Sequence, residues 1–154
     1  MIWFTSDTHF GHSNIIKYTG RPFKTIEEMN ECIINRWNSR VKEDDTVFFL
    51  GDFSLGNPKK YLERLNGNIV WIKGNHDKTA IIKELNINYG GYLWHLAHKP
   101  EDCTGRYNLC GHVHEKWKIK VQKNNKILVN VGVDQWDFYP IKIQEIIKEI
   151  KNKI

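Results

Sequence analysis

Short apolar runs alternate with amphipathic stretches along the first half of the chain. Ile2–Ser6, Thr46–Leu50 and Ile69–Ile72 are apolar runs that end at polar clusters, a pattern typical of buried strands. Thr25 and Glu28 form a capping box, and the apolar residues that follow recur at helical spacing, which predicts a long helix. This half of the chain therefore resembles repeated β–α units.

Two shorter helices are expected in the same half. Asn57-Pro58 suits the N-cap and the first position of a helix that runs to about Leu65. A further helix is predicted from about Lys78 to Leu85, after the third strand.

The second half reads as a run of strands. Four are predicted from apolar and alternating segments, namely Tyr92–Ala97, Tyr107–Cys110, Trp117–Gln122 and Ile127–Val131, with Asn124-Asn125 as a hairpin turn. A final helix is expected from about Ile143 to Asn152. This order of elements predicts an α/β (α+β) protein with a mixed sheet, or two facing sheets, and helices outside.

Composition narrows the class of protein without identifying it. The 154 residues fit one domain, residues 1–154, and 40% hydrophobic with 27% charged residues is a globular balance. No apolar run reaches the roughly 18–20 residues that span a bilayer, and the first residues lack the features of a signal peptide, so we expect a cytoplasmic protein without a membrane partner. The net charge of +5 mildly favours anionic partners. Three cysteines without a C-x-x-C pair favour reduced thiols.

Side chains that can bind metals gather where the predicted strands end. One such residue alone is usually a cap or a solvated turn, but chance does not readily place one at nearly every exit of one sheet edge. In α/β sheets, ligands bind beyond the carboxyl ends of strands. The residues at these exits are Asp7, His9, Asp52, Asn75, His76, His98, His112 and His114.

The types of these side chains indicate a chemistry. Carboxylate, imidazole and amide groups without thiolates suit Mn, Fe or Zn rather than a structural cysteine site. A carboxylate that bridges two ions would complete a two-metal site, with ions about 3.5–4 Å apart that clamp the attacking and leaving oxygens of a displacement. Two divalent cations held by two carboxylates keep a positive charge, which favours phosphate esters as substrates.

These residues lie in motifs that resemble, in order, those of the calcineurin-like metallophosphoesterase superfamily. The motifs are Asp7-Thr8-His9, Gly51-Asp52, Gly74-Asn75-His76-Asp77, Leu96-Ala97-His98-Lys99-Pro100 and Gly111-His112-Val113-His114. The match spans residues 2 to 114, and the five motifs together are highly specific. Phe4 to Phe23 and Asn130-Val131-Gly132-Val133-Asp134 resemble the short, capless bacterial and phage branch. The resemblance implies a four-layer αββα sandwich of two mixed β-sheets flanked by helices.

The resemblance also implies a role for each matched residue. The first metal would be held by Asp7, His9, Asp52 and His114. The second would be held by Asp52, Asn75, His98 and His112, so that Asp52 bridges the two. His76 would be a catalytic imidazole that binds no metal, with Asp77 as its partner. The cofactors would be two divalent metal ions, with Mn²⁺ favoured and Fe, Ni or Zn as alternatives.

Three further residues carry weaker hypotheses. His12 could contact phosphate or a metal ligand, or simply begin a helix or loop. Arg21 could clamp phosphate through its forked guanidinium, although a loop arginine paired with a surface carboxylate is the favoured alternative. His95 competes with His98 as a ligand, but strand alternation puts the two on opposite faces and only His98 has the family context.

The expected reaction is hydrolysis of small phosphate esters, with a preference for diesters, by a hydroxide that bridges the metals. His76 would stabilise the developing charge or protonate the leaving group. A catalytically idle interaction module of the same fold is one alternative, but it would have lost His76 or a metal ligand, and neither is lost. A small nuclease is another, since the charge permits nucleic acid, but the chain offers no added domain to grip a polymer. The physiological substrate and the oligomeric state stay open.

Overall fold

The first sheet consists of three short parallel strands. The computed structural model describes residues 1–154, and in it β1 (Ile2–Thr5), β2 (Thr46–Phe49) and β3 (Asn68–Trp71) are hydrogen-bonded in that order. Phe4 on the free edge of β1 forms an antiparallel bridge with Ile141. Because the three strands run in the same direction, their carboxyl ends meet at one edge of the sheet.

The second sheet has five strands, all from the second half of the chain. Across the sheet these are β4 (Glu84–Tyr89), β5 (Tyr92–Ala97), β6 (Tyr107–Cys110), β8 (Ile127–Asn130) and β7 (Ile119–Val121). The central strands β5, β6 and β8 are parallel, whereas the edge strands β4 and β7 are antiparallel to their neighbours. The sheet is therefore mixed, as the sequence predicts.

The turn between β7 and β8 confirms the predicted hairpin. It is a short 3₁₀ segment, η2 (Lys123–Asn125), in which Asn124 and Asn125 have φ angles of 68° and 59°. Asparagine tolerates this left-handed region better than most residues, which is why the pair turns the chain here.

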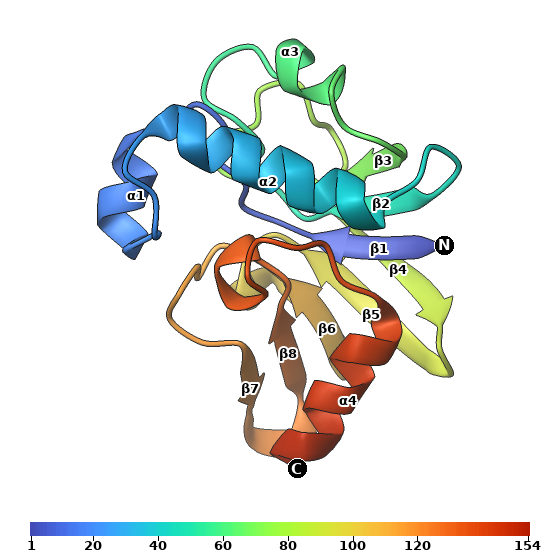
Figure 1. Ribbon diagram of the computed structural model, residues 1–154. Coiled ribbons are helices and arrows are strands. Elements are labelled where there is room, and N and C mark those ends of the chain that lie inside the picture. Colours follow the sequence, from blue (N-terminus) through green and yellow to red (C-terminus); the bar gives the residue numbers. More distant parts are fainter.

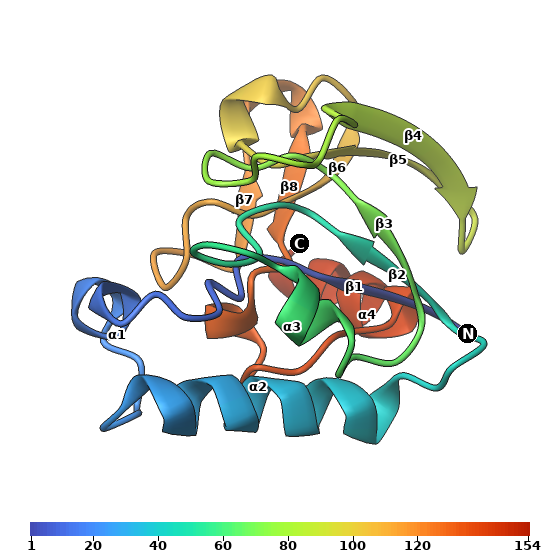
Figure 2. The same ribbon diagram turned by 90° about the horizontal axis from the view of Figure 1, so that it is seen from above.

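The long helix α2 (Ile26–Arg40) covers the outer face of the first sheet (Figures 1 and 2). The Thr25 hydroxyl accepts a hydrogen bond from the Glu28 N–H at 3.1 Å, so the predicted cap starts this helix. The buried residues of α2 pack in one cluster with those of β1 and β2, including Met29, Ile33, Ile34, Trp37, Trp3, Val47 and Phe49. Two shorter helices, α1 (Asn14–Thr19) and α3 (Lys59–Leu62), add residues to the same cluster.

A second apolar cluster joins the two sheets. Phe4 and Leu50 from the first sheet and its exits meet Trp94 and Leu96 from β5. Helix α4 (Ile143–Lys153) packs into this cluster and contacts β1 and β7, so it extends the cover that the narrow first sheet gives to the wider second one (Figure 1). None of the helices is long and apolar enough to cross a membrane.

The outer face of the second sheet is covered by short segments. Ala97, Cys110 and Leu128 pack there with Cys103, which directly follows the 3₁₀ helix η1 (Pro100–Asp102). The predicted pair of sheets flanked by helices is confirmed. The two outer faces are covered unequally, because the long helix α2 lies on the first sheet and only the short turn η1 lies near the outer face of the second.

One predicted helix is wrong. Residues 78 to 83 form no helix, and the expected end of that helix, Leu85, lies in strand β4. Leu85, Ile87 and Tyr89 are half-buried and pack on the cluster between the sheets, while the residues between them are exposed. This alternation with a period of two is a strand signal in the sequence. The structure follows it and forms a strand where the predicted helix was expected to end.

The remaining elements agree with the predictions apart from small shifts at their ends. Two strands of the second sheet, β5 and β6, have the predicted limits. The predicted strand Trp117–Gln122 is shorter, and the helix after Asn57-Pro58 ends at Leu62 instead of about Leu65. Helix α1 was not predicted.

Backbone hydrogen bonds bring the strand exits of both sheets together. The Asp7 N–H donates to the Gly51 carbonyl at 2.9 Å, which joins the exits of β1 and β2. The Val133 N–H donates to the Ser6 carbonyl at 3.0 Å, which joins the segment after β8 to the exit of β1. The ligand-bearing loops of the two sheets therefore meet on one side of the molecule.

Two leucines of β5 test whether the cluster between the sheets holds the fold. Leu96 is fully buried in that cluster, whereas Leu93 on the same strand is 58% exposed. Leu96→Ala should lower the free energy of unfolding by about 2–5 kcal/mol, and Leu93→Ala should change it by no more than about 0.5 kcal/mol. Denaturant unfolding of the two variants measures the difference, and equal losses would contradict this assignment of the core.

Candidate metal centre

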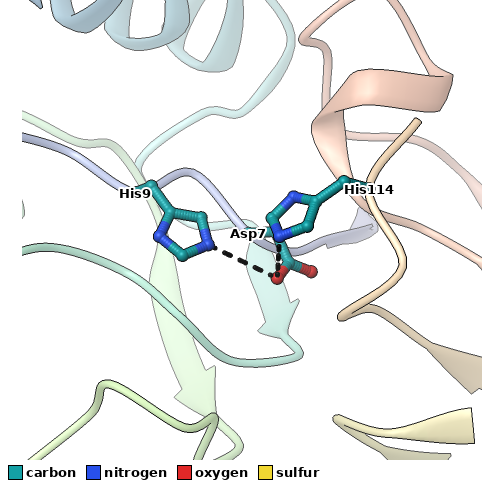
Figure 3. A group of neighbouring side chains, drawn as sticks. All are labelled: Asp7, His9 and His114. Carbon is teal, nitrogen blue, oxygen red and sulfur yellow. Dashed lines mark ion pairs between the residues drawn. The ribbon is translucent and has the colours of Figure 1, made fainter. Parts of the chain in front are cut away.

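Two groups of three potential ligands lie at the strand exits. The first is Asp7, His9 and His114 (Figure 3), and the second is Asp52, His98 and His112. Within each group one nitrogen or oxygen atom of every side chain lies within 4.8 Å of the others. We call them the first and the second triad. Each combines one carboxylate with two imidazoles from distant parts of the chain.

The two carboxylates each keep one oxygen free of backbone contacts. Asp7 Oδ2 accepts hydrogen bonds from the Ser6 hydroxyl and the His112 N–H, while Asp7 Oδ1 has no hydrogen-bond partner. Asp52 Oδ1 accepts a hydrogen bond from the His76 N–H at 2.9 Å. The other oxygen, Asp52 Oδ2, lies 3.7 Å from His9 Nε2, so it faces a member of the first triad.

The same Asp52 oxygen also faces the second triad. Asp52 Oδ2 lies 3.2 Å from His98 Nε2. A single carboxylate oxygen therefore lies next to one imidazole of each triad. This is the placement that a bridging ligand requires.

Three imidazoles present the same nitrogen to the carboxylates. In His98, Nδ1 donates to the Leu50 carbonyl at 2.6 Å, which leaves Nε2 facing Asp52. In His114, Nδ1 lies 3.3 Å from Asp134 Oδ2, and Nε2 faces Asp7. In the same way His9 uses Nδ1 for a contact with His12 and turns Nε2 inward. An imidazole whose Nδ1 is held by a carbonyl or carboxylate is oriented to offer Nε2 to a metal.

The buried polar atoms without partners support cation binding. Asp7 Oδ1, His9 Nε2 and His98 Nε2 are inaccessible to water and have no hydrogen-bond partner. A buried polar atom without a partner costs free energy, so native proteins rarely leave several in one place. Carboxylate oxygens and neutral imidazole nitrogens are ligands of Mn, Fe and Zn, and the two triads therefore fit a pair of divalent cations.

The backbone at these residues is unusual. Five of the seven predicted ligands have positive φ, a region that residues other than glycine seldom adopt; they are Asp7, His9, Asp52, His112 and His114, with φ between 48° and 74°. Each such residue costs on the order of 1–3 kcal/mol, and strain of this kind collects at functional sites. The rest of the fold therefore stabilises a geometry that the local sequence does not favour.

Glycines make room for the ligands at these tight exits. Gly51 has φ of 102°, and a Cβ at this position would lie 2.5 Å from His98 Nδ1. A Cβ at Gly111 would clash with the Asp7 carboxylate. The glycines of the predicted motifs thus allow the strands to approach closely enough for ligands from different loops to meet.

In the absence of a cation, the carboxylates and the imidazoles of the two triads shift one another's pKa values. Burial by itself would raise the pKa of Asp7, but the nearby His9 and His98 imidazoles hold that pKa well below its usual value. Burial by itself would lower the pKa of His98, but Asp52, Asp7 and the Leu50 carbonyl raise it to about 9. A proton therefore resides on His98 at neutral pH, and a cation that uses Nε2 must displace it.

The third-strand motif lies on the rim of the site. Asn75 and His76 are exposed, and no hydrogen bond joins the Asn75 side chain to either triad. The His76 ring lies beside the first triad, with its centroid 5.7 Å from that of His9 and 6.1 Å from that of His12. His76 is therefore close enough to the triads to contact a molecule bound there.

Asp77 has different partners from the one expected. It was predicted to hold the His76 imidazole, but its buried carboxylate accepts hydrogen bonds from three backbone N–H groups, those of Asp52, Phe53 and Gly74, at 2.7–3.0 Å. No hydrogen bond joins the Asp77 and His76 side chains. Asp77 therefore fixes the exits of β2 and β3 to each other, and through them the Asp52 backbone.

Arg21 pairs with a carboxylate, as its favoured interpretation expected, instead of being free to clamp phosphate, but this carboxylate is buried and not on the surface. Its guanidinium is fully buried and forms a two-pronged ion pair with Asp134, with Nε–Oδ1 at 2.9 Å and Nη2–Oδ2 at 3.0 Å. It also donates to the carbonyls of Thr8 and Asp7, at 2.9 and 2.6 Å. The N–H donors of this guanidinium are directed at groups of the protein, so Arg21 has no free donor for a substrate.

The last residue of β8 and the segment after it support the first triad, and sequence reasoning gave them no role. Asp134 contacts the His114 imidazole, and the side-chain amides of Asn130 and Gln135 both donate to the His114 carbonyl, at 2.9 and 3.1 Å. Asn130 is fully buried at the end of an apolar strand. A buried polar residue in an apolar strand needs hydrogen-bond partners. Asn130 was therefore the signal in the sequence that this segment has a structural role.

The two remaining histidines are clearly separated. His12 is partly exposed, and its Nδ1 lies 3.4 Å from His9 Nδ1, at the edge of the first triad. His95 is buried and accepts a hydrogen bond from the Thr104 N–H at 3.2 Å, and it joins neither triad. Of the two histidines compared as ligands, His95 on β5 and His98 just after it, only His98 joins a triad.

Comparisons with known proteins match nearly the whole length of the chain. A family model described as calcineurin-like phosphoesterase matches residues 1–152. A protein of Methanocaldococcus jannaschii is 40% identical and covers 97% of this chain and 91% of its own length. The Gene 66 protein of Mycobacterium phage D29 is 24% identical, with 97% of each chain covered. A solved structure from Aquifex aeolicus is 27% identical, covers 96% of this chain and 98% of that one, and has a TM-score of 0.75.

Arg21→Lys tests whether the buried ion pair supports cation binding. Lysine keeps the charge but cannot hold Asp134 and the two carbonyls together, so the first triad should lose about 10–100-fold in cation affinity. Calorimetric titration of the cation-free protein with Mn²⁺ measures this loss. Arg64→Lys is the matched control, because Arg64 forms a similar two-pronged pair with Glu31 on the surface. Identical titrations of the two variants would contradict the role of Arg21.

Cation binding should also depend on pH through His98. Its pKa is raised from 6.5 to about 9, so its proton stabilises the cation-free protein fully below pH 6.5, and this stabilisation is lost as the pH rises to about 9. Because a cation competes with that proton, the rise in Tm on adding Mn²⁺ should grow across the same pH range. Thermal unfolding with and without Mn²⁺ measures it, and a Tm rise that is constant with pH would count against His98 as a ligand.

Proposed function

The chain belongs to the calcineurin-like phosphoesterase family, and on this basis we propose that it hydrolyses phosphodiesters with two divalent cations held by the two triads. Family membership supports metal-dependent hydrolysis of phosphate esters in general. The finer proposal rests on one observation, the Asp52 oxygen that faces an imidazole of each triad. A shared carboxylate oxygen is what holds two cations close enough to act on one phosphate.

The proposed ligand sets follow the triads. Asp7, His9, Asp52 and His114 would hold the first cation. Asp52, Asn75, His98 and His112 would hold the second, and for Asn75 this requires its exposed side chain to turn inward from the rim. Mn²⁺ is the proposed cation, since the donor set contains no thiolate.

The cations would supply Lewis acidity, by lowering the pKa of a bound water towards about 7 and by neutralising charge on the phosphoryl oxygens. The chain's own residues would orient the substrate and manage its protons. Two carboxylates with a charge of −2 against two dications leave the site positive, so an anionic ester is attracted to it. A site of this charge favours phosphate over neutral esters.

His76 is the proposed acid of the reaction. Its backbone N–H is held by Asp52, while its ring is exposed beside His9 and His12. From there the ring can donate a proton to the oxygen of the departing alcohol, and His12 on the same rim can contact a phosphoryl oxygen. A fixed backbone with an exposed ring suits a group that must meet the substrate without binding a cation.

A diester suits this site better than a monoester. A monoester carries a second negative charge, and a guanidinium is the side chain that usually pairs with it. Arg21, the arginine next to the first triad, has its donors occupied by protein groups. With no free guanidinium at the centre, the singly charged phosphodiester is the substrate that the proposed site accommodates.

His76→Ala and Asp52→Asn separate the two proposed roles. His76→Ala should keep both cations and lose about 10²–10⁴ in the rate of diester hydrolysis, the usual range for a general acid. Asp52→Asn should lose cation binding as well as activity, because the shared oxygen would lose its charge. Turnover of bis(p-nitrophenyl) phosphate together with the metal content measures both effects. If His76→Ala turned over normally with its cations bound, the role proposed for His76 would be wrong.

A further inference from the structure

A cavity lies beside the proposed acid, away from the triads. Its volume is about 520 Å³, within the range of sites that hold small organic molecules. Its walls are the segment after β2, from Ser54 to Pro58, and the segment after β3, from Asn75 to Thr79. Asn75 and His76 therefore belong both to this cavity and to the rim of the metal centre. A phosphoryl group alone is far smaller than this space.

Most of the residues that line the cavity are polar or small. Of its 11 residues only Leu55 and Trp71 are large and apolar. Asn57 accepts a hydrogen bond from the Lys59 N–H, which leaves its amide group free to donate, and Thr79 adds a hydroxyl. A group with hydrogen-bonding atoms therefore finds partners in this cavity, beside the apolar surface of Leu55 and Trp71.

The charges of the lining favour an anionic substrate. Both oxygens of the Asp77 carboxylate are occupied by backbone N–H groups. Lys78 is exposed and forms no ion pair, so its positive charge is free to attract an anionic substrate.

Trp71 gives the cavity a fixed aromatic residue. Its ring packs against Phe53 with centroids 5.3 Å apart. Its indole nitrogen is buried and has no acceptor in the protein. Flat rings bind well to aromatic side chains held in this way, at a low cost in conformational entropy.

We propose that this cavity receives the leaving alcohol of the diester and that this alcohol is a nucleoside, which names the substrate class for the function proposed above. A nucleoside combines a flat ring, which suits Trp71 and Leu55, with a hydroxylated sugar, which suits Asn57 and Thr79. Its size also suits the volume. In the reaction the oxygen of water bonds to phosphorus and one of its protons is released, while the bond from phosphorus to the nucleoside oxygen breaks. The nucleoside oxygen takes a proton from His76, and the proton released by the water restores the one that His76 gave up. The products are a free nucleoside and a phosphate monoester.

Three diesters test this assignment on the Mn²⁺-loaded protein. Thymidylyl-thymidine has a nucleoside as its leaving group, and glycerophosphoglycerol has a smaller hydroxylated alcohol without a ring. Thymidylyl-thymidine should have a kcat/KM at least about tenfold higher, because the contacts that fill the cavity are missing for glycerol. Equal values for the two diesters would overturn the proposal. Bis(p-nitrophenyl) phosphate serves as the activated reference, and if it too is not hydrolysed, the proposed function fails rather than the assignment of the cavity.

Two leucine variants locate the effect. Leu55 lines the cavity and is 57% exposed, and Leu93 on the second sheet is 58% exposed and lies outside it. Leu55→Ala removes apolar contact with the ring, so it should lower kcat/KM for thymidylyl-thymidine by about tenfold, mainly through KM. Leu93→Ala should leave it unchanged. The rise in Tm with Mn²⁺ shows that each variant is folded and binds cations. A folded, cation-binding Leu55→Ala variant with the wild-type kcat/KM would contradict the assignment.

Discussion

The Asp7 and Asp52 side chains are 0% and 3% exposed, and each has a carboxylate oxygen 3.7 Å from the same nitrogen, His9 Nε2. Two like charges are thus held close together where water barely reaches them. In such surroundings the repulsion is much stronger than in water, and burying either charge alone already costs several kcal/mol. Opposite charge must be present. A proton on His98, whose pKa is raised to about 9, supplies part of it in the cation-free protein, and Asp134 and Asp7 raise the pKa of His114 in the same direction. Two divalent cations would supply it more fully.

A second layer of contacts keeps these charges in place. Arg21 ties the backbone after β1 to Asp134, and Asp134 orients His114. Asp77 joins the exits of β2 and β3 by accepting hydrogen bonds from backbone N–H groups of both. Arg21, Asp134 and Asp77 are charged side chains whose hydrogen-bond partners are groups of the protein. Each of them joins loops that are distant in sequence. The left-handed backbone of five ligands needs such support, because the local sequence does not favour it.

The sequence predicts what depends on local pattern. Buried strands, the cap at Thr25 and the asparagine turn before β8 follow from neighbouring residues, and they agree with the structure. The positions of the metal-binding side chains at strand exits follow from the strands. The partners of Arg21 and Asp77 could not be predicted in this way, because they depend on which distant loops meet. The error at β4 is of another kind, since its alternating pattern was present in the sequence.

The cavity beside His76 extends the site beyond the two triads, and the substrate class assigned to it depends on the metal centre being what we propose. The most direct test is diffraction from crystals grown with Mn²⁺, with data collected near the manganese absorption edge. We expect two anomalous peaks, one among Asp7, His9 and His114 and one among Asp52, His98 and His112, both in contact with Asp52. A single peak, or peaks away from Asp52, would contradict the account.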